Sequence, residues 1–346
     1  MTEGRRRRTA AAAGVLAAVV LGAAGGAVWL GRALHTPWSA WDGPFVDVVL
    51  EPGLAAGTMV DRLADVGVLR DPRVAKLWLL WTGDAARLHA GEYRFDEPAT
   101  VPQVVDRLIR GDVLLHAVTI PEGWTMDLVA HRFESAGFGS YAEMLASFTD
   151  PSPILAWDPE APDLEGYLFP DTYHFPRGVE PGAIAAAMVD RFLAVVGPEF
   201  PDRARDVGLD LRGAVTLASL VEAETSVAAE RPRVARVFHN RLERGMRLEC
   251  DPTVLYALSR AGRSRVKLTY RDLAFESPWN TYRVAGLPPG PICAPGQASL
   301  AAAVAPSDGD DLYFVASPDG GHSFSPDLVS HLEAVAAWRR YSGSSK

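Results

Sequence analysis

Few residues of the kind that bind transition metals are present in this sequence. Its 346 residues contain two cysteines and eight histidines. Neither Cys250 nor Cys293 has a second ligand at the spacing of a zinc site, and the His-Glu-x-x-His pattern of zinc hydrolases is missing. We therefore expect no metal site, no zinc chemistry and no organic cofactor.

An excess of positive charge is also missing. Lysine and arginine number 34 against 43 aspartates and glutamates, which gives a formal net charge of -9. Nucleic-acid binding needs concentrated basic side chains that replace phosphate counterions, so we predict no nucleic-acid partner. Apolar residues, in contrast, make up 48% of the chain, which is enough for folded cores and for two domains.

The long apolar run of the sequence lies near the N-terminus. The arginines at 5–8 precede an uncharged stretch at 9–31, which has about the 20 residues that a helix needs to cross a bilayer. Positive flanks stay in the cytoplasm, so we expect the rest of the chain to be extracytoplasmic. The predicted order is a basic cytoplasmic tail at 1–9, a single-pass transmembrane helix at 10–31 and a linker at 32–44. The alternatives are a cleaved signal peptide, including the twin-arginine type, and an Ala/Gly-rich segment that does not insert stably.

One pattern occurs twice in the first half of the chain. A strand-like run at 46–50 is followed by a Pro-Gly turn and a helix-like segment, and the same order returns at 118–137. We interpret this as an internal repeat of strand, tight turn and helix. The repeat does not by itself indicate a binding role, because units that only build a compact α+β domain would give the same pattern. Equivalent positions in the two copies are Gly53 and Gly123, Leu63 and Phe133, and Gly67 and Gly137.

A carboxylate continues the apolar face of the helix expected at 211–225. Leu217, Leu220 and Val221 lie on one helical face, and Glu224 follows on that same face. An apolar environment raises the pKa of a carboxyl group, which a general acid that works near neutral pH requires. A second carboxylate, Glu222, lies on the neighbouring face of smaller residues. The alternative interpretation places both glutamates in solvent at a helix end.

Several segments together resemble the endolytic murein transglycosylase family, which is also called MltG or YceG-like. The resemblance covers nearly the whole chain after the N-terminal tail. It implies an α+β protein with a membrane anchor, one or more small LysM-like modules at 45–178 and a mainly helical, lysozyme-like catalytic domain at 179–346. The segments that carry the resemblance are Leu217 to Thr225, Glu230 to Leu248, Asp251-Pro252-Thr253-Val254, Asn280-Thr281-Tyr282, Gly286-Leu287-Pro288-Pro289-Gly290 and Gly320-Gly321-His322-Ser323-Phe324.

The resemblance implies cleavage of the MurNAc-GlcNAc bond in nascent glycan strands, which would end their elongation. A lytic transglycosylase needs one carboxyl group, which protonates the glycosidic oxygen and then removes the proton of the C6 hydroxyl of the same sugar. The product carries a 1,6-anhydro-MurNAc end. In lysozyme-like transglycosylases a small hydroxyl residue follows the acid, so Glu224 before Thr225 is the predicted catalytic residue.

The other predicted site residues would contact substrate. Glu222 is the fallback acid and a supporting contact, and Asp251 also suits the N-cap of a helix. Arg241 could pair with Glu243 or Glu230. The set predicted to bind substrate is Glu222, Asn240, Asp251, Asn280, Thr281 and Tyr282.

The expected setting is the outer side of the cell inner membrane, with peptidoglycan glycan strands as substrate. Penicillin-binding proteins and division or elongation proteins are the implied protein partners. A non-catalytic peptidoglycan-binding scaffold is the alternative function. A hydrolytic muramidase is a third reading and needs a second carboxylate, for which Glu249 is the candidate, in place of the glutamine common in the family. Outside the cytoplasm Cys250 and Cys293 can form a disulfide, or both can remain buried free thiols.

Overall fold

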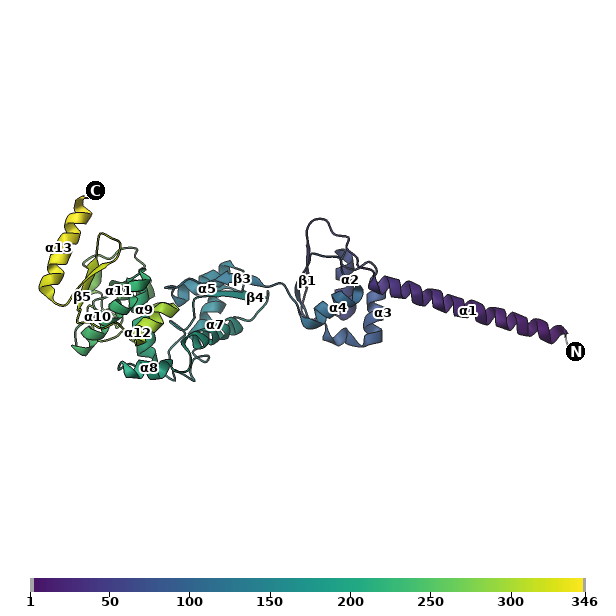
Figure 1. Ribbon diagram of the computed structural model, residues 1–346, viewed down its shortest axis with the longest axis horizontal. Helices are drawn as coiled ribbons and strands as arrows, with labels where there is room; N and C mark the ends of the chain where they lie inside the picture. Colours follow the sequence, from purple (N-terminus) through teal and green to yellow (C-terminus); the bar gives the residue numbers. More distant parts are fainter. Residues whose placement is uncertain (1–2, 345–346) are drawn as a thin grey trace. The chain divides into compact units, whose positions relative to one another are not determined.

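The computed structural model describes residues 3–344, with side chains described at 13–342. It confirms a mixed α+β protein with an N-terminal apolar helix (Figure 1). The chain divides into two compact units: unit 1 holds the chain up to His116 and residues 175–178, and unit 2 holds 117–174 and the chain from Val179. The module expected at 45–178 is therefore divided between the two units.

Unit 1 begins with α1 (Glu3–His35), whose apolar stretch Ala13–His35 contains a window of 18 residues with a mean hydropathy of 2.0. Residues 1–2 of the predicted basic tail, and the side chains of its arginines, lie outside the described residues. The helix runs into the predicted linker, and Leu34 in its last turn belongs to the core of unit 1. The other elements of unit 1 are β1 (Val46–Leu50), α2 (Ala56–Asp65), α3 (Pro72–Thr82), η1 (Asp84–Arg87), β2 (Gly91–Phe95) and α4 (Val101–Arg110).

Unit 2 starts with the second copy of the repeat and continues into a helical region. Its first part consists of β3 (His116–Thr119), α5 (Met126–Ser135), α6 (Tyr141–Thr149), β4 (Thr172–Phe175) and α7 (Pro181–Val196). Its second part consists of α8 (Phe200–Asp206), α9 (Leu211–Glu224), η2 (Ala228–Glu230), α10 (Arg231–Glu243), α11 (Asp251–Arg260), η3 (Asp272–Ala274), α12 (Gln297–Val304), β5 (Tyr313–Ala316), β6 (His322–Ser325) and α13 (Leu328–Ser344). The helices predicted at 183–196, 211–225 and 231–244 are confirmed to within two residues.

The internal repeat is confirmed in three dimensions. Each copy is a strand, two helices and a second strand that pairs with the first, followed by a third helix. In the first copy β1 and β2 are antiparallel, with Val46 opposite Phe95. All four repeat glycines have φ between 76° and 84°, a conformation that a side chain disfavours. The paired positions Leu63 and Phe133 are fully buried because each helix packs this residue onto its own small core.

The core of the second part of unit 2 is built around α9. Residues 214–221 of α9 are all buried, and α8, α10, α11 and α12 pack around it. The antiparallel hairpin β5–β6, with Ala316 opposite His322, contacts α10 and α13. This packing fixes the C-terminal end of α9.

Candidate active site

The last turn of α9 carries the predicted acid. Asp210 caps the start of the helix by accepting a hydrogen bond from the backbone N–H of Gly213 at 2.6 Å. The helix ends at Glu224, and Thr225 already has extended backbone angles. Because the preceding two turns are buried, core packing fixes the position of Glu224 where the helix leaves the core.

The surroundings of Glu224 change its acidity. Burial raises its pKa to about 7, and the charge of Asp251 contributes to the rise. The Cys250 thiol, which hydrogen-bonds the carboxylate, and the charges of His322 and Arg241 act in the opposite direction. Near neutral pH the group is therefore present in comparable amounts as acid and as carboxylate.

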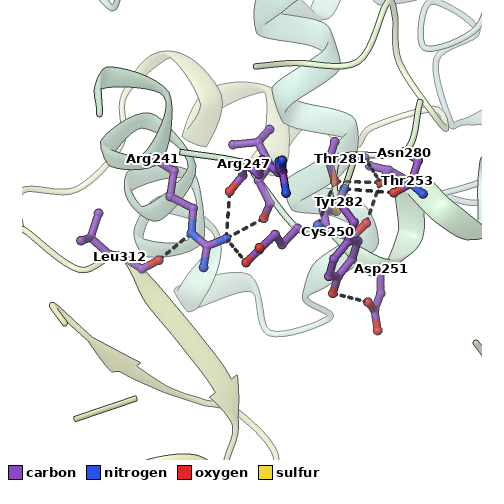
Figure 2. Close-up of polar contacts among 11 residues, drawn as sticks. Arg241, Arg247, Cys250, Asp251, Thr253, Asn280, Thr281, Tyr282 and Leu312 are labelled. Carbon is purple, nitrogen blue, oxygen red and sulfur yellow. Dashed lines mark hydrogen bonds and ion pairs between the residues drawn. The ribbon is translucent and has the colours of Figure 1, made fainter. Parts of the chain in front are cut away.

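Two of the predicted substrate residues lie close enough to Glu224 for their charges to interact. Asp251 is exposed at the start of α11 and accepts a hydrogen bond from the Tyr282 hydroxyl at 2.7 Å (Figure 2). Cys250, rather than Asp251, occupies the N-cap position of α11. Burial and the hydrogen bond to Asp251 raise the pKa of Tyr282, so its phenol stays protonated and continues to donate.

Asn280 holds the loop that precedes Tyr282. Its side-chain nitrogen donates to the backbone oxygens of Leu273 at 3.0 Å and Phe275 at 2.7 Å. Its side-chain oxygen accepts from the backbone N–H of Tyr282 at 2.9 Å. The residue is fully buried, so these contacts position Tyr282, a different role from the sugar contact predicted from sequence.

Thr281 joins the same loop to the start of α11. Its hydroxyl accepts from the backbone N–H of Cys250 at 2.9 Å and lies 2.9 Å from the Thr253 hydroxyl (Figure 2). Thr281 is fully buried as well. It therefore sets the position of the two residues, Cys250 and Asp251, that act on the pKa of Glu224.

Arg241 holds the segment that precedes Cys250 through hydrogen bonds to its backbone oxygens. The buried guanidinium donates to the backbone oxygens of Leu312 at 2.7 Å and Leu248 at 2.9 Å, as Figure 2 shows for Leu312. Its ion-pair partner is Glu249, at 3.5 Å, and not Glu243 or Glu230 as considered from the sequence. Within the described part of the chain, Glu249 is the one non-glycine residue with positive φ, at 51°. Such backbone strain is common at functional sites.

Asn240 is buried on α10. Its side-chain nitrogen donates to the backbone oxygens of Gly309 at 3.1 Å and Asp311 at 2.8 Å, and its oxygen accepts from Arg236 at 2.8 Å. These bonds connect α10 to the segment that leads into β5. Its predicted contact with substrate remains a prediction.

Glu222 is bound entirely by protein groups. One carboxylate oxygen accepts from Arg231 at 2.9 Å, and the other accepts from the Gly296 N–H at 2.9 Å and the Ser299 hydroxyl at 2.8 Å. Its side chain is only 6% exposed. Glu122, from the Pro-Gly turn of the second repeat copy, lies 3.6 Å from Arg231, and burial and the charge of Glu222 raise its pKa. Glu222 therefore joins α9, α10 and the start of α12.

His322 and Glu230 belong to the site but were not among the predicted residues. Glu230 accepts from the backbone N–H of His322 at 2.8 Å and lies 2.7 Å from its ring Nδ1. The Thr225 hydroxyl, next to Glu224, donates to Glu230 at 3.4 Å. Hydrogen bonding to His322 lowers the pKa of Glu230, although burial opposes this. The His322 segment belonged to the family resemblance, and that was the signal that could have identified it.

The Glu230→Gln variant tests this positioning role. Without the Glu230 carboxylate, the imidazole of His322 loses its charged partner and can leave its position. We expect kcat to fall about 10- to 100-fold with KM little changed, because a small displacement of an active-site group is costly. Steady-state rates of glycan cleavage, the activity that the resemblance implies, would measure both constants. Glu243→Gln, an exposed glutamate on α10, is the control and is expected to behave as wild type. An unchanged kcat in Glu230→Gln would exclude the role.

Cys250 and Cys293 are both free and buried, which answers the question left open by the sequence. The Cys293 thiol donates to the backbone oxygen of Ser219 at 3.4 Å within the core. The Cys250 thiol lies at Glu224 instead. Burial raises the pKa of both thiols, so they stay protonated and Cys250 can act as a hydrogen-bond donor.

Comparison with known proteins is consistent with this arrangement. The sequence model of the YceG-like family matches residues 48–337. The chain belongs to the YceG-like family. In this YceG-like chain the match begins within β1 and ends within α13, so it includes both repeat copies and every residue of the site described above.

Relatives of this YceG-like chain carry a functional name. It is 30% identical over 326 residues to the endolytic murein transglycosylase of Bacillus subtilis (strain 168), with 90% of the chain and 89% of that protein aligned. It is 28% identical to the endolytic murein transglycosylase of Streptococcus pneumoniae (strain D39), covering 68% of the chain but 47% of that longer protein. The crystal structure of a yceG-like protein from Listeria monocytogenes is also similar: TM-score 0.58 and 32% identity over 84% of the chain and 98% of that structure.

Proposed function

We propose that this protein is a membrane-anchored endolytic lytic transglycosylase of peptidoglycan. It cleaves the MurNAc-GlcNAc bond of nascent glycan strands without water, leaves 1,6-anhydro-MurNAc ends and so terminates strand elongation. The names of the relatives support the activity. The observation that carries the mechanism is Glu224, a carboxyl group with a pKa near 7 at the end of a buried helix.

The two proton transfers use this one group. Protonated Glu224 donates its proton to the glycosidic oxygen as the bond from C1 to that oxygen breaks, and the leaving sugar departs as an alcohol. The C6 hydroxyl of the same muramic sugar then attacks C1, and the Glu224 carboxylate takes up the hydroxyl proton. The acid is regenerated and no water is consumed. A pKa near the working pH suits a group that must both give and accept a proton.

Asp251 and Tyr282 complete the proposed site beside Glu224. The negative charge of Asp251 helps to keep Glu224 protonated, as its contribution to the raised pKa indicates. The same charge favours the positive charge that develops at C1 when a glycosidic bond breaks. The phenol of Tyr282, held by Asp251, presents its ring and hydroxyl to the sugar.

The pH dependence of the reaction should follow Glu224. Because the first step needs the acid form, we expect kcat/KM to fall as pH rises above about 7, the pKa of Glu224. Cys250→Ala removes a hydrogen bond that favours the carboxylate, so the alkaline limb should move to higher pH in this variant. Rates across the pH range for both proteins measure this. A flat profile through pH 9 would contradict the assignment of Glu224 as acid.

The architecture supports two finer proposals. The order strand, helix, helix, strand in each repeat copy supports LysM-like, glycan-binding modules within 45–178. The helices packed around α9 support a lysozyme-like catalytic domain at 179–346. We further propose that α1 anchors the protein in the cell inner membrane, with the N-terminus cytoplasmic and the catalytic domain extracytoplasmic. Penicillin-binding, division or elongation proteins remain proposed partners.

A digest of purified glycan strands tests the proposal against the scaffold alternative. The full chain in detergent should shorten long strands to internal fragments, which chromatography by length would resolve. Co-sedimentation with the strands in the absence of any fragment would instead favour a non-catalytic scaffold. A partly buried carboxyl group with a raised pKa favours the enzyme, because withdrawing such a group from water is costly unless it has a use.

A further inference from the structure

One face of α3 is apolar although solvent covers it. Val74, Ala75 and Leu79 turn into the core of unit 1 and are at most 4% exposed. Leu80 and Trp81, on the other side of the same helix, are 80% and 77% exposed. Leu77 is half exposed beside them. Adjacent large apolar side chains on a surface mark an interaction site. We call Leu77, Leu80 and Trp81 the outer face of α3.

The outer face of α3 lies next to the C-terminal part of α1. A groove of about 450 Å³ lies between the two helices within unit 1. Figure 1 shows α3 beside the C-terminal end of α1. Leu34 is buried in the core of unit 1, so the end of α1 is fixed to the unit. From α1 the groove is lined by Ala27, Leu30, Gly31, Leu34 and His35, and from α3 by Leu77, Trp78 and Trp81.

The length of α1 places this level at the edge of a bilayer. Its apolar stretch starts at Ala13, and about 20 helical residues cross the hydrocarbon core, so the core ends near Arg32. Trp29 is 61% exposed one turn earlier, where tryptophan is common in transmembrane proteins. Trp81 lines the same groove as Ala27 and Leu30, which places it close to the depth of these residues. The outer face of α3 therefore lies at the boundary between lipid headgroups and acyl chains.

A basic cavity lies at the same level. It has a volume of about 760 Å³ and is lined, among others, by Trp29, Arg32, Arg70 and Arg73. One carboxylate, Asp71, also lines the cavity, and it accepts a hydrogen bond from the backbone N–H of Arg73 at 2.9 Å, so three arginines face one acidic side chain. We call the cavity that Arg32, Arg70 and Arg73 line the basic cavity. Its position matches that of the phosphate groups of the lipids around α1.

We propose that unit 1 docks on the outer leaflet of the membrane, with the outer face of α3 inserted between lipids and the basic cavity bound to the phosphate of an anionic phospholipid. This rests on the proposed membrane anchor. An amphipathic helix with tryptophan and leucine binds in the interfacial plane, and basic residues near the surface add affinity for anionic lipids. Docking holds the first repeat copy against the membrane from which nascent strands grow.

Depth-dependent quenching tests the insertion of α3. An environment-sensitive dye would be attached in the full chain at Leu80→Cys, since both native cysteines are buried, and the protein reconstituted in vesicles of phosphatidylcholine and phosphatidylglycerol. We expect lipids with a quencher near the headgroup to quench this dye. Val20→Cys, within the apolar stretch of α1, reports on the anchor through lipids with a quencher deep in the acyl chain. Glu51→Cys is exposed at the opposite end of the β1–β2 pair from Ala99, which lines the basic cavity, and should not be quenched by either lipid.

The three positions distinguish the possible failures. Quenching at 20 without quenching at 80 would overturn the docking of α3 and leave the anchor intact. Quenching at neither position would mean that the anchor itself fails, which overturns both. Quenching at 20, 80 and 51 alike would show adsorption without orientation and would also overturn the proposal.

The basic cavity has its own test. Replacing Arg70 and Arg73 by Gln should lower the ratio of quenched to unquenched dye at position 80 about fivefold or more in vesicles with phosphatidylglycerol. In vesicles of phosphatidylcholine alone the variant should match wild type. Arg87→Gln, an exposed arginine outside the cavity, is the control. Equal ratios in all membranes, or loss of the effect on adding inorganic phosphate, would overturn the assignment to a phospholipid.

Discussion

Replacing Glu224 by Gln is expected to lower the rate of glycan cleavage by about a thousandfold, within the range supplied by a general acid or base. Glutamine has nearly the same size but cannot donate a proton to the glycosidic oxygen or accept one from the C6 hydroxyl. The rate would be followed by fragment release from purified glycan strands. Binding of the strands should change little, because the carboxyl group acts on the bond being broken.

The pKa of Glu224 also predicts whether this variant melts above or below wild type at a given pH. Burial raises the pKa of Glu224 from an ordinary 4.5 to about 7 in the folded protein. Stability from this group is therefore fully present below about pH 4.5 and is lost as pH rises through 7. Glu224→Gln, which cannot ionise, should melt like wild type at pH 5 and slightly higher at pH 8. Activity retained in such a well-folded variant would remove Glu224 from the mechanism.

Glu249→Gln is the matched control for the Glu224 experiment. Glu249 is half exposed and paired with Arg241, and glutamine at this position should leave cleavage within a few-fold of wild type. If Glu249→Gln abolished cleavage as well, a second essential carboxylate would be present. That result would favour a hydrolytic muramidase, which uses two such groups.

Replacing Glu222 by Ala is expected to destabilise the protein by about 3 kcal/mol, the lower end of the usual cost of breaking a buried ion pair, because Glu122 stays 3.6 Å from Arg231. Arg231 would lose its partner at 2.9 Å, and the start of α12 would lose two hydrogen bonds. Urea denaturation of wild type and variant measures the difference. Glu276→Ala, which breaks an exposed pair with Arg283, should cost at most about 1 kcal/mol. A cost below 1 kcal/mol for Glu222 as well would show that its contacts do not stabilise the fold.

The features predicted from sequence depend on local periodicity. The helix of Glu224 has a regular apolar face, and the side chains that form this face are buried up to Val221, one turn before the partly exposed Glu224. The repeat is readable because glycines with positive φ must recur at equivalent turns, as Gly53 and Gly123 do. The family resemblance added the identity of the reaction, which no periodicity can reveal.

The roles of Asn280 and Thr281 could not be predicted in this way. The family resemblance predicts that both contact substrate, yet the polar group of Asn280 binds backbone atoms of its own loop and that of Thr281 binds the backbone N–H of Cys250 at the start of α11. Such bonds depend on tertiary packing between segments far apart in sequence. The same holds for His322, whose charge acts on Glu224 and whose position depends on its hydrogen bonds to Glu230, 92 residues earlier in the chain.

The most direct test of the account is a digest of purified peptidoglycan by the full chain in water enriched in oxygen-18, with the product ends identified by mass spectrometry. We predict internal fragments with 1,6-anhydro-MurNAc ends that contain no heavy oxygen, formed by wild type and missing with Glu224→Gln. Reducing ends that carry the heavy isotope would show that water attacks C1. That outcome would contradict a lytic transglycosylase mechanism with Glu224 as its single acid and base.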